Sequence, residues 1–396
     1  MTPAQIEQFR LETPGTKNRM HFNNAGSALT PQPVIDAIQQ HFQLEIEIGG
    51  YEAEATAHHK IEDFYNVMAR FLNCQPRNIA YTGSATDAYN RALSAISFAK
   101  GDVILTTKND YVSNQIAFLE LQKRFGVQLI RAEDLPEGGV DVDSVRGLIQ
   151  KHRPKLVAVT HVPTNSGLVQ PVAAIGEICK AENIWYLVDA CQSAGQMPLN
   201  VQEIHCDFLS ATFRKFLRGP RGAGFLYVSD KALDAGLEPL FLDLLSANWT
   251  ASDGYETRPD ARRFELWERP HALMLGSKVC VEYAMTIGLS QIETRVKYLA
   301  DLCREKLSAI PGIKNLDKGK ARCGITTYAI TGWESNALKA KLQEFRINTS
   351  ITTRLGAQLD FAEKGVDWAL RVSPHYYNTE EEVVQLTESL KSLMHF

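Results

Sequence analysis

The feature that most restricts the fold of this chain is an alternation of short apolar runs with amphipathic segments between residues 79 and 228. VILTT at 103–107 and KLVAVTHV at 155–162 are two such runs, and each precedes a segment with the apolar spacing of a short helix. Strands buried on both faces of a parallel sheet have this nearly continuous apolar character. The pattern predicts an α/β fold with strands at residues 79–81, 103–107, 127–132, 155–162, 184–190, 207–213 and 222–228.

The pattern changes after about residue 265, where long amphipathic helices replace the regular alternation. We expect helices at 276–288, 289–310 and 336–346, strands at 324–331 and 369–373, and a last helix that begins after Thr379. Thr379 and Glu382 have the spacing of a capping box. The sequence therefore predicts a large α/β domain at 22–264 and a smaller α+β domain made of 1–21 and 265–396.

Charge and hydropathy exclude several classes of protein. The 42 Lys and Arg residues against 46 Asp and Glu residues give a net charge of −4, without the basic excess of nucleic-acid-binding proteins. No apolar run reaches the roughly 18 residues of a membrane span. The N-terminal segment lacks an apolar stretch and carries Glu7 and Glu12, which argues against a secretory signal. We expect neither a nucleic-acid partner nor a membrane partner.

The cysteines indicate a reducing compartment. There are seven, an odd number, no CxxC motif occurs, and most lie in apolar segments. Such a set is typical of reduced thiols and not of a disulfide framework or a zinc cluster. We therefore expect a cytoplasmic protein without a bound metal.

Two polar features lie where strands meet helices. The segment GSAT at 83–86 follows a strand and opens a helix, where free N–H groups and the helix dipole favour a phosphate, although such turns often only cap the helix. Asp189 ends the apolar strand IWYLVDA, and a buried carboxylate there needs a partner, either a ligand cation or the N-terminus of the next helix. Open α/β sheets bind ligands at this edge.

Two basic residues are equally conspicuous. Lys215 follows the strand DFLSATF, lies between two phenylalanines and has arginines nearby, surroundings that lower a lysine pKa and suit covalent chemistry, unless it is a surface lysine. Arg371 lies in the apolar strand WALRV and needs an anion, either a ligand carboxylate or a structural ion pair. Lysine, carboxylate, phosphate donors and arginine together are what pyridoxal phosphate (PLP) and its amino-acid substrates require.

Five motifs occur along the chain in this order: NAG at 24–26, GSATD at 83–87, VDACQ at 188–192, TFRK at 212–215 and RVSPHYYNT at 371–379. On these motifs, the chain resembles the class V aminotransferase family of fold type I PLP enzymes. Cysteine desulfurases, selenocysteine lyases, isopenicillin N epimerase-like proteins and ergothioneine-pathway C–S lyases belong to that family. The resemblance extends over roughly residues 20–390. It implies PLP as cofactor and a large, mostly parallel seven-stranded sheet domain with a smaller α+β C-terminal domain.

The resemblance also implies roles for individual residues. Lys215 matches the catalytic lysine that binds the cofactor aldehyde, and Asp189 matches the partner of the ring nitrogen. Gln192 matches the glutamine at the ring hydroxyl. Asn165 matches the asparagine beside the ring. The phosphate ligands correspond to Ala85, Thr86 and Thr212.

For the substrate, Arg371 matches the arginine that binds the amino-acid carboxylate, and Asn24 matches an N-terminal contact. Two positions depart from the family pattern. Tyr111 stands where relatives stack a histidine on the ring, and a tyrosine cannot replace an imidazole as acid and base at neutral pH. Arg214 stands where many relatives have a histidine before the lysine, so the route of the proton differs here.

A missing thiol is the most informative departure. Desulfurases carry a nucleophilic cysteine in a loop of the pattern RxGxxC, but the matching segment here is RLGAQL at 354–359, with Leu359 in place of that cysteine. A persulfide mechanism requires a thiolate near the substrate sulfur. Cys191, next to Gln192, is interpreted as a small wall residue.

We therefore expect a PLP-dependent C–S lyase that performs β-elimination on a cysteine-derived amino acid, S-substituted or a sulfoxide, without a catalytic cysteine. An aminotransferase, an amino-acid epimerase and an inactive PLP-binding paralogue are the alternatives. The segments EIEIGGY at 45–51 and RKFLRGPRG at 214–222 resemble the lyases and epimerase-like proteins more than the desulfurases. A small amino-acid substrate and a homodimer are the expected partners.

Overall fold

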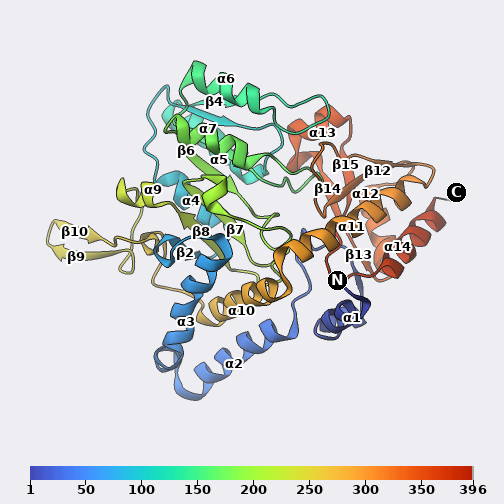
Figure 1. Ribbon diagram of the computed structural model, residues 1–396, viewed down its shortest axis with the longest axis horizontal. Coiled ribbons are helices and arrows are strands. Elements are labelled where there is room, and N and C mark those ends of the chain that lie inside the picture. Colours follow the sequence, from blue (N-terminus) through green and yellow to red (C-terminus); the bar gives the residue numbers. More distant parts are fainter. Residues whose placement is uncertain (395–396) are drawn as a thin grey trace.

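A mixed seven-stranded sheet forms the centre of the computed structural model, which describes residues 1–394 (Figure 1). Only β8 runs against its neighbours, so the sheet is mostly parallel, and each of the seven predicted strands is confirmed. The strand order across the sheet is β2 (Ile79–Thr82), β8 (Gly224–Val228), β7 (Phe208–Thr212), β6 (Trp185–Asp189), β5 (Leu156–Thr160), β3 (Val103–Thr106) and β4 (Gln128–Arg131).

Successive strand residues pack into two separate cores because side chains alternate between the faces of a strand. Val157 and Val159 of β5 belong to the larger core, and Ala158 between them belongs to the other. Both faces are thus covered, which explains the continuous apolar runs. The larger core includes α3 (Gly50–Leu72), α6 (Val142–His152) and α7 (Val172–Ala181); α4 (Ala85–Ser94) and α5 (Val112–Phe125) cover the opposite face.

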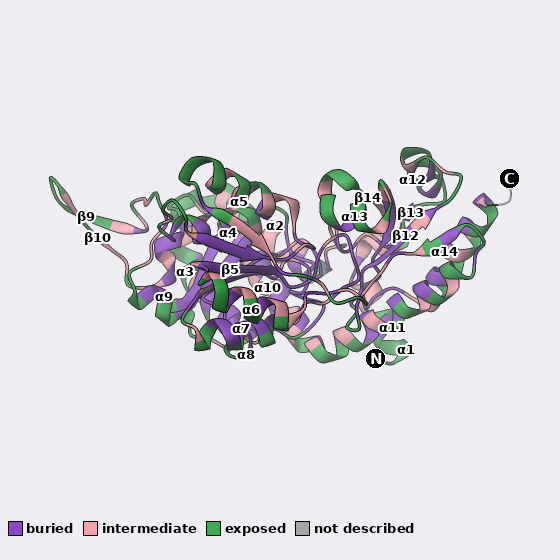
Figure 2. Ribbon diagram, turned by 90° about the horizontal axis from the view of Figure 1, so that it is seen from above, coloured by how far each residue is buried: buried purple, intermediate pink, exposed green. Residues whose placement is uncertain are grey.

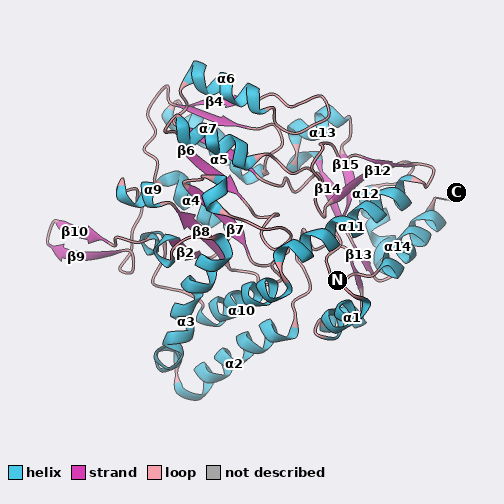
Figure 3. Ribbon diagram, viewed as in Figure 1, coloured by secondary structure: helices cyan, strands magenta, loops and turns pink. Residues whose placement is uncertain are grey.

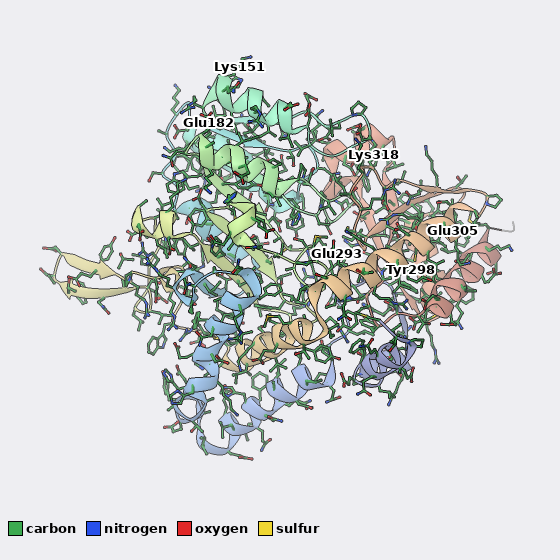
Figure 4. All side chains as sticks on the ribbon, viewed as in Figure 1. Lys151, Glu182, Glu293, Tyr298, Glu305 and Lys318 are labelled. Carbon is green, nitrogen blue, oxygen red and sulfur yellow. The ribbon has the colours of Figure 1, made fainter. Side chains whose placement is uncertain are left out.

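The helix α10 (His271–Ile287) packs against α2 (Gln32–Ile48) and α3 of the large domain, although it follows residue 264. The chain then bends by 80° at Gly288, whose φ of +93° favours glycine, and α11 (Leu289–Ser308) continues toward the smaller sheet. Figure 4 shows Glu293, Tyr298 and Glu305 spaced along α11. The link between the two parts of the molecule is therefore a pair of helices that meet at a sharp corner.

The smaller sheet is antiparallel and lies at the other end of the molecule (Figures 1 and 2). Its order is β11 (Ile313–Asn315), β12 (Thr326–Ile330), β15 (Trp368–Val372) and β14 (Ser350–Thr353). Its core is shared with α11, α12 (Ser335–Glu344) and α14 (Glu380–Leu393). The N-terminal β1 (Met20–His21) pairs in parallel with β13 (Ile347–Asn348), and the capping box of Thr379 and Glu382 is present.

A hairpin of β9 (Ala247–Ala251) and β10 (Gly254–Thr257) projects from the large domain (Figures 1 and 3). The sequence pattern did not predict it, because its residues are mostly exposed and its strands contribute nothing to a core. Within residues 1–394, no single helix has the length and hydropathy to cross a membrane; α10 and α11 meet those criteria only as a bent pair. The remaining helices are α1 (Pro3–Leu11), α8 (Val201–Ile204), α9 (Asp230–Asp234), α13 (Gln358–Lys364) and four short 3-10 helices (Pro14–Lys17, Pro76–Asn78, Ala261–Phe264 and Arg354–Gly356).

Candidate active site

A cavity of about 240 Å³ lies at the carboxyl ends of the parallel strands, the edge at which open α/β sheets bind ligands. Its wall combines the N-terminus of α4, the end of β6 and the turn after β7. Seven of the ten residues predicted from the sequence line it: Ala85, Thr86, Tyr111, Asp189, Gln192, Thr212 and Lys215.

The α4 N-terminus supplies free backbone donors. Ser84 caps the helix by accepting a hydrogen bond from the Asp87 amide (3.1 Å), and the first-turn amides of Ala85 and Thr86 have no partner within the helix. Gly224 of β8 brings a neighbouring strand against this turn, because a Cβ there would lie 2.6 Å from the Ser84 carbonyl carbon. The close approach leaves a cradle of amides that suits a phosphate.

Asp189 lies at the end of β6 and is buried. Its carboxylate accepts hydrogen bonds from the Cys191 amide (2.9 Å) and from the Asn114 side chain (3.2 Å). Both donors are neutral, and within the described residues no cation pairs with this carboxylate. A positively charged ring nitrogen in the cavity would supply that charge.

Lys215 lies in the turn after β7, between the fully buried Phe213 and Phe216. Its Nζ lies 5.9 Å from the centre of the Tyr111 ring. Burial lowers the pKa of Lys215, and Arg214 adds to the effect, while Asp189 opposes it. A buried amine with a lowered pKa is available as a neutral nucleophile and as a base.

Arg371 of β15 lies behind Thr164, which lines the cavity. Its guanidinium donates to the Thr164 hydroxyl (2.7 Å) and to the Asn23 amide oxygen (3.2 Å), while its buried Nε has no hydrogen-bond partner. Arg371 forms no ion pair within residues 1–394, so the structural ion pair considered above is absent from that part of the chain. Burial lowers its pKa to about 10, as expected for a cation that lacks an anion.

Gln192 donates to the same Thr164 hydroxyl (2.7 Å) and to the Ala25 carbonyl (3.0 Å). Its Oε1 is buried without a partner. Thr164 therefore accepts hydrogen bonds from both Gln192 and Arg371, and its own hydroxyl proton remains available. Thr164 could not be predicted from the sequence, because a single threonine in a loop has no distinctive spacing.

Asn24 and Asn165 do not line the cavity. The Asn24 amide donates to the Ser373 carbonyl (2.8 Å) and accepts from the Tyr377 hydroxyl (2.6 Å), and it is fully buried. Asn165 accepts from the Thr352 hydroxyl and donates to the Gly356 carbonyl (2.9 Å), both in the small domain. In this conformation, the side chains of both asparagines join the two parts of the chain.

A second buried carboxylate, Asp110, lies behind Asp189 and was missed by the sequence analysis. Asn114 connects the two, with its amide nitrogen 3.1 Å from Asp110 and 3.2 Å from Asp189. Asp110 lies four residues beyond the end of β3 (Val103–Thr106), whereas Asp189 is the last residue of β6. The argument that drew attention to Asp189, an acid at the carboxyl end of a buried parallel strand, could have found it.

All seven cysteines are free, as predicted. Cys191 alone lines the cavity, and burial raises the pKa of its thiol to about 12. The segment 354–359 carries the exposed Leu355 and Leu359. Across residues 1–394, no cluster of side chains is suited to hold a metal ion.

These features fit PLP. The free amides of Ala85 and Thr86 suit its phosphate, Asp189 suits its ring nitrogen, and Lys215 suits its aldehyde. The unpartnered Oε1 of Gln192 is a buried polar atom beside the same cavity, as expected where a ligand completes the hydrogen bonding.

Comparisons with known proteins agree with this chemistry. The profile of the Aminotransferase class-V family matches residues 20–386. A probable cysteine desulfurase of Methanothermobacter thermautotrophicus is 28% identical over 400 residues, which cover 98% of both chains. The apo structure of the cysteine desulfurase from Thermococcus onnurineus NA1 superposes with a TM-score of 0.90 at 28% identity, covering 98% of this chain and 97% of that chain.

The cystine C–S lyase C-DES has the same fold. A solved structure of a C-DES mutant, with glycine covalently linked to its PLP cofactor, gives a TM-score of 0.85 at 21% identity and covers 96% of this chain and 98% of its own. The expected fold, with its seven-stranded sheet, and the expected PLP cofactor are confirmed.

Proposed function

Because the chain belongs to the aminotransferase class-V family and is a PLP-dependent enzyme, we propose that it is a C–S lyase acting on a cysteine-derived amino acid. The substrate would be S-substituted cysteine or its sulfoxide. The observation that carries this proposal is the chemistry of the cavity wall, which combines a buried lysine and a buried carboxylate with no reactive thiolate.

PLP, when bound, supplies an electron sink for the negative charge that develops at the substrate Cα. Lys215 would hold it by its aldehyde, Asp189 at its ring nitrogen, and Ala85, Thr86 and Thr212 at its phosphate. The amine of Lys215 would also be the base that takes the Cα proton of the substrate. Burial lowers the pKa of Lys215, which favours the neutral amine that a base requires.

Arg371 would orient the substrate through its carboxylate. The guanidinium is held from one side by Thr164 and Asn23, while its Nε remains unpartnered. A buried cation without an anion favours a ligand that brings a negative charge.

The sulfur would leave as a small molecule. The C–S bond breaks as the Cα proton is removed, the sulfur departs as thiolate or sulfenate, and the remaining three-carbon enamine takes up water to give pyruvate and ammonia. A desulfurase would instead transfer sulfur to a protein thiolate. Cys191 is the one cavity-lining cysteine among the described residues, and its raised pKa keeps it protonated.

We also propose a cytoplasmic homodimer. The apolar residues of α10 do not by themselves support it, because this helix packs against α2 and α3 of the same chain. Exposed apolar side chains elsewhere do: Phe42, Ile46 and Tyr51 at the α2–α3 corner, Trp249 on the hairpin, and Trp267. In such a dimer, Phe264–His271 would lie beside the partner's cofactor.

Product analysis tests the proposal. The purified, PLP-loaded protein is incubated with S-substituted cysteines, their sulfoxides and free cysteine, and pyruvate and the released sulfur compound are measured. We expect equal amounts of both, and their loss in Lys215→Ala together with the visible absorbance of the lysine-bound cofactor. A persulfide on the protein would restore the desulfurase interpretation, and amination of a 2-oxo acid or inversion at Cα would favour the aminotransferase or the epimerase.

A further inference from the structure

We propose that Asp110 is a positioning residue that acts through Asn114 to fix Asp189 against the cofactor ring. The inference rests on PLP binding and on the assignment of Asp189 to the ring nitrogen, and it does not depend on the choice of a lyase. Asp110 itself does not line the cavity, so its effect must pass through neighbouring side chains.

Asp110 is the centre of a buried hydrogen-bond network. It is 7% exposed, and Asn114, Thr160 and Asp189 are each exposed by 4% or less. Its carboxyl group accepts from the side chains of Gln115 (2.7 Å), Asn114 (3.1 Å) and Thr106 (3.2 Å), from the Thr160 hydroxyl, and from the Tyr111 amide (2.7 Å). Five donors converging on one buried carboxyl group leave it little freedom to rotate.

The network joins three strand ends to one helix. Thr106 ends β3, Thr160 ends β5 and Asp189 ends β6, whereas Asn114 and Gln115 lie in the first turn of α5. Asp110 thus ties the start of α5 to the strand ends that form the cavity floor. It also accepts from the amide of Tyr111, the residue whose ring faces Lys215.

Asn114 carries the effect to Asp189. Its amide nitrogen lies within hydrogen-bond distance of Asp110 (3.1 Å), Asp189 (3.2 Å) and Thr160 (3.3 Å). An NH₂ group has two hydrogens, so one directed at Asp110 sets the direction of the other toward Asp189. On the far side, Arg131 donates to the Gln115 oxygen (2.7 Å), which orients the Gln115 amide nitrogen toward Asp110.

Asp189 depends on this support because it has few partners. Its Oδ2 accepts only the Asn114 hydrogen bond within the described residues, and its Oδ1 accepts from the Cys191 amide. Without Asn114, Oδ2 would have no donor within the described residues, and the Cys191 amide alone would orient the carboxylate. A misaligned Asp189 would stabilise the proton on the ring nitrogen less well. The nitrogen that joins Lys215 to the cofactor would then keep its own proton to a higher pH, because a less positive ring withdraws less charge from it.

The test compares three variants by two measurements that need no turnover: the affinity of the apoprotein for PLP, and the pH midpoint of the visible absorbance of the lysine-bound cofactor. Asp110→Asn and Asn114→Ala should each weaken PLP binding about tenfold, as for loss of one hydrogen bond to a charged group, and raise the pH midpoint. The double variant should show little further change, because both substitutions break the same link. The charged and titratable groups around Lys215 are Tyr111, Asp189, Cys191, Arg214 and Arg371, and all of them remain in place.

Asp207→Asn is the matched control. Asp207 is 5% exposed and also accepts several hydrogen bonds, including one from the Tyr186 amide (3.0 Å), but it lies away from the cavity. It should lower stability and leave both measurements unchanged. An Asp110→Asn variant that loses stability but keeps the wild-type midpoint and PLP affinity would overturn the proposal. A double variant whose midpoint shift equals the sum of the two single-variant shifts would overturn it as well.

Asn114→Ala also protects the test against misfolding, since Asp110 keeps four other donors in that variant. A wild-type midpoint in folded Asn114→Ala overturns the proposal whatever happens to Asp110→Asn. Failure to form pyruvate would count against the lyase proposal alone, because neither measurement involves substrate.

Discussion

The guanidinium of Arg218 lies over the ring of Tyr377, with its central carbon 4.4 Å from the ring centre. Arg218 is 1% exposed, and it also donates to the Leu29 carbonyl (2.9 Å), the Thr13 hydroxyl (2.6 Å) and the Tyr376 hydroxyl. It forms no ion pair within residues 1–394. A buried cation held by aromatic faces and neutral oxygens thus joins the catalytic-lysine turn, the N-terminal segment and the small domain.

Arg218→Lys should lower the free energy of unfolding by about 2–4 kcal/mol, because an ammonium group cannot reproduce the planar stacking or reach all three oxygens. Urea unfolding measures the change. Arg153→Lys is the control: Arg153 has a positive φ like Arg218 (47° and 62°), but it is exposed and pairs with Glu182 at the surface. Arg153→Lys should change the free energy of unfolding by less than about 0.5 kcal/mol. Equal losses in both variants would show that the backbone conformation, and not the aromatic cage, governs stability.

Arg371→Lys should raise KM for the amino-acid substrate about 10–100-fold while the cofactor absorbance stays intact. The reason is that a lysine cannot clamp a carboxylate with two parallel hydrogen bonds. Arg304→Lys provides the comparison, since Arg304 is equally buried at 7% exposure but pairs with Asp317 (2.8 Å) in the small domain. It should lower stability with KM unchanged. Loss of cofactor and unfolding in Arg371→Lys would instead assign Arg371 a structural role.

Much of the large domain could be predicted from the sequence because its strands are buried on both faces. An apolar run such as 155–162, when helices flank it, predicts a buried parallel strand, and β5 occupies the centre of that run. The hairpin at 247–257 and the long α2 were not predicted. The hairpin buries almost nothing, so its sequence carries no apolar alternation, and its Asp-Gly turn at 253–254 was its one local signal.

The candidate site divides in the same way. Residues tied to a strand end or a helix start, such as Asp189 and Ala85, lie where the local sequence pattern places them. Asn165 and Asn24 lie elsewhere because their side chains meet residues about 190 or more positions away in the chain, at Thr352 and Ser373. No local pattern contains such contacts. Asp110 is a different case, because four of its five donors, Thr106, Tyr111, Asn114 and Gln115, lie within five residues of it in the chain.

Asn165→Ala should loosen the segment from β14 to α13. Asn165 holds it through the Thr352 hydroxyl and the Gly356 carbonyl (2.9 Å), so its loss removes one buried and one partly buried hydrogen bond between the domains. Amide hydrogen exchange in residues 352–358 should quicken about tenfold. Asn66→Ala, on the exposed side of α3, should leave this exchange unchanged. Wild-type exchange in Asn165→Ala would mean that other contacts hold the segment.

Cys191→Ser should keep turnover within several-fold of the wild type, because a thiol with a pKa raised to about 12 by burial is not a nucleophile at neutral pH. Serine preserves the size of the side chain and the backbone amide that donates to Asp189. The other six cysteines, replaced one at a time, should behave likewise. Mass spectrometry after turnover checks for sulfur bound to protein; a persulfide on Cys191, together with lost activity in the serine variant, would contradict the lyase mechanism.

The last prediction concerns acid sensitivity and begins at His21. Burial lowers its pKa to about 4, with a further contribution from the nearby Arg218 charge. In the unfolded chain, the histidine pKa is about 6.5. Between these values only the unfolded state takes up the proton, so the stabilising contribution of neutral His21 is complete above about pH 6.5 and is lost as the pH falls toward 4.

Between about pH 7 and pH 4, His21 alone should therefore decrease the free energy of unfolding by roughly 3 kcal/mol. His161 adds to the decrease, because burial lowers its pKa to about 4 as well. His21→Gln should reduce the decrease in the free energy of unfolding between pH 7 and pH 4 by about this amount, because glutamine does not titrate. This holds even if the substitution lowers stability at pH 7. The exposed His58→Gln variant should retain the wild-type slope. Urea unfolding at several pH values measures both slopes, and an unchanged slope in His21→Gln would mean that His21 takes up its proton in the folded state as readily as in the unfolded one.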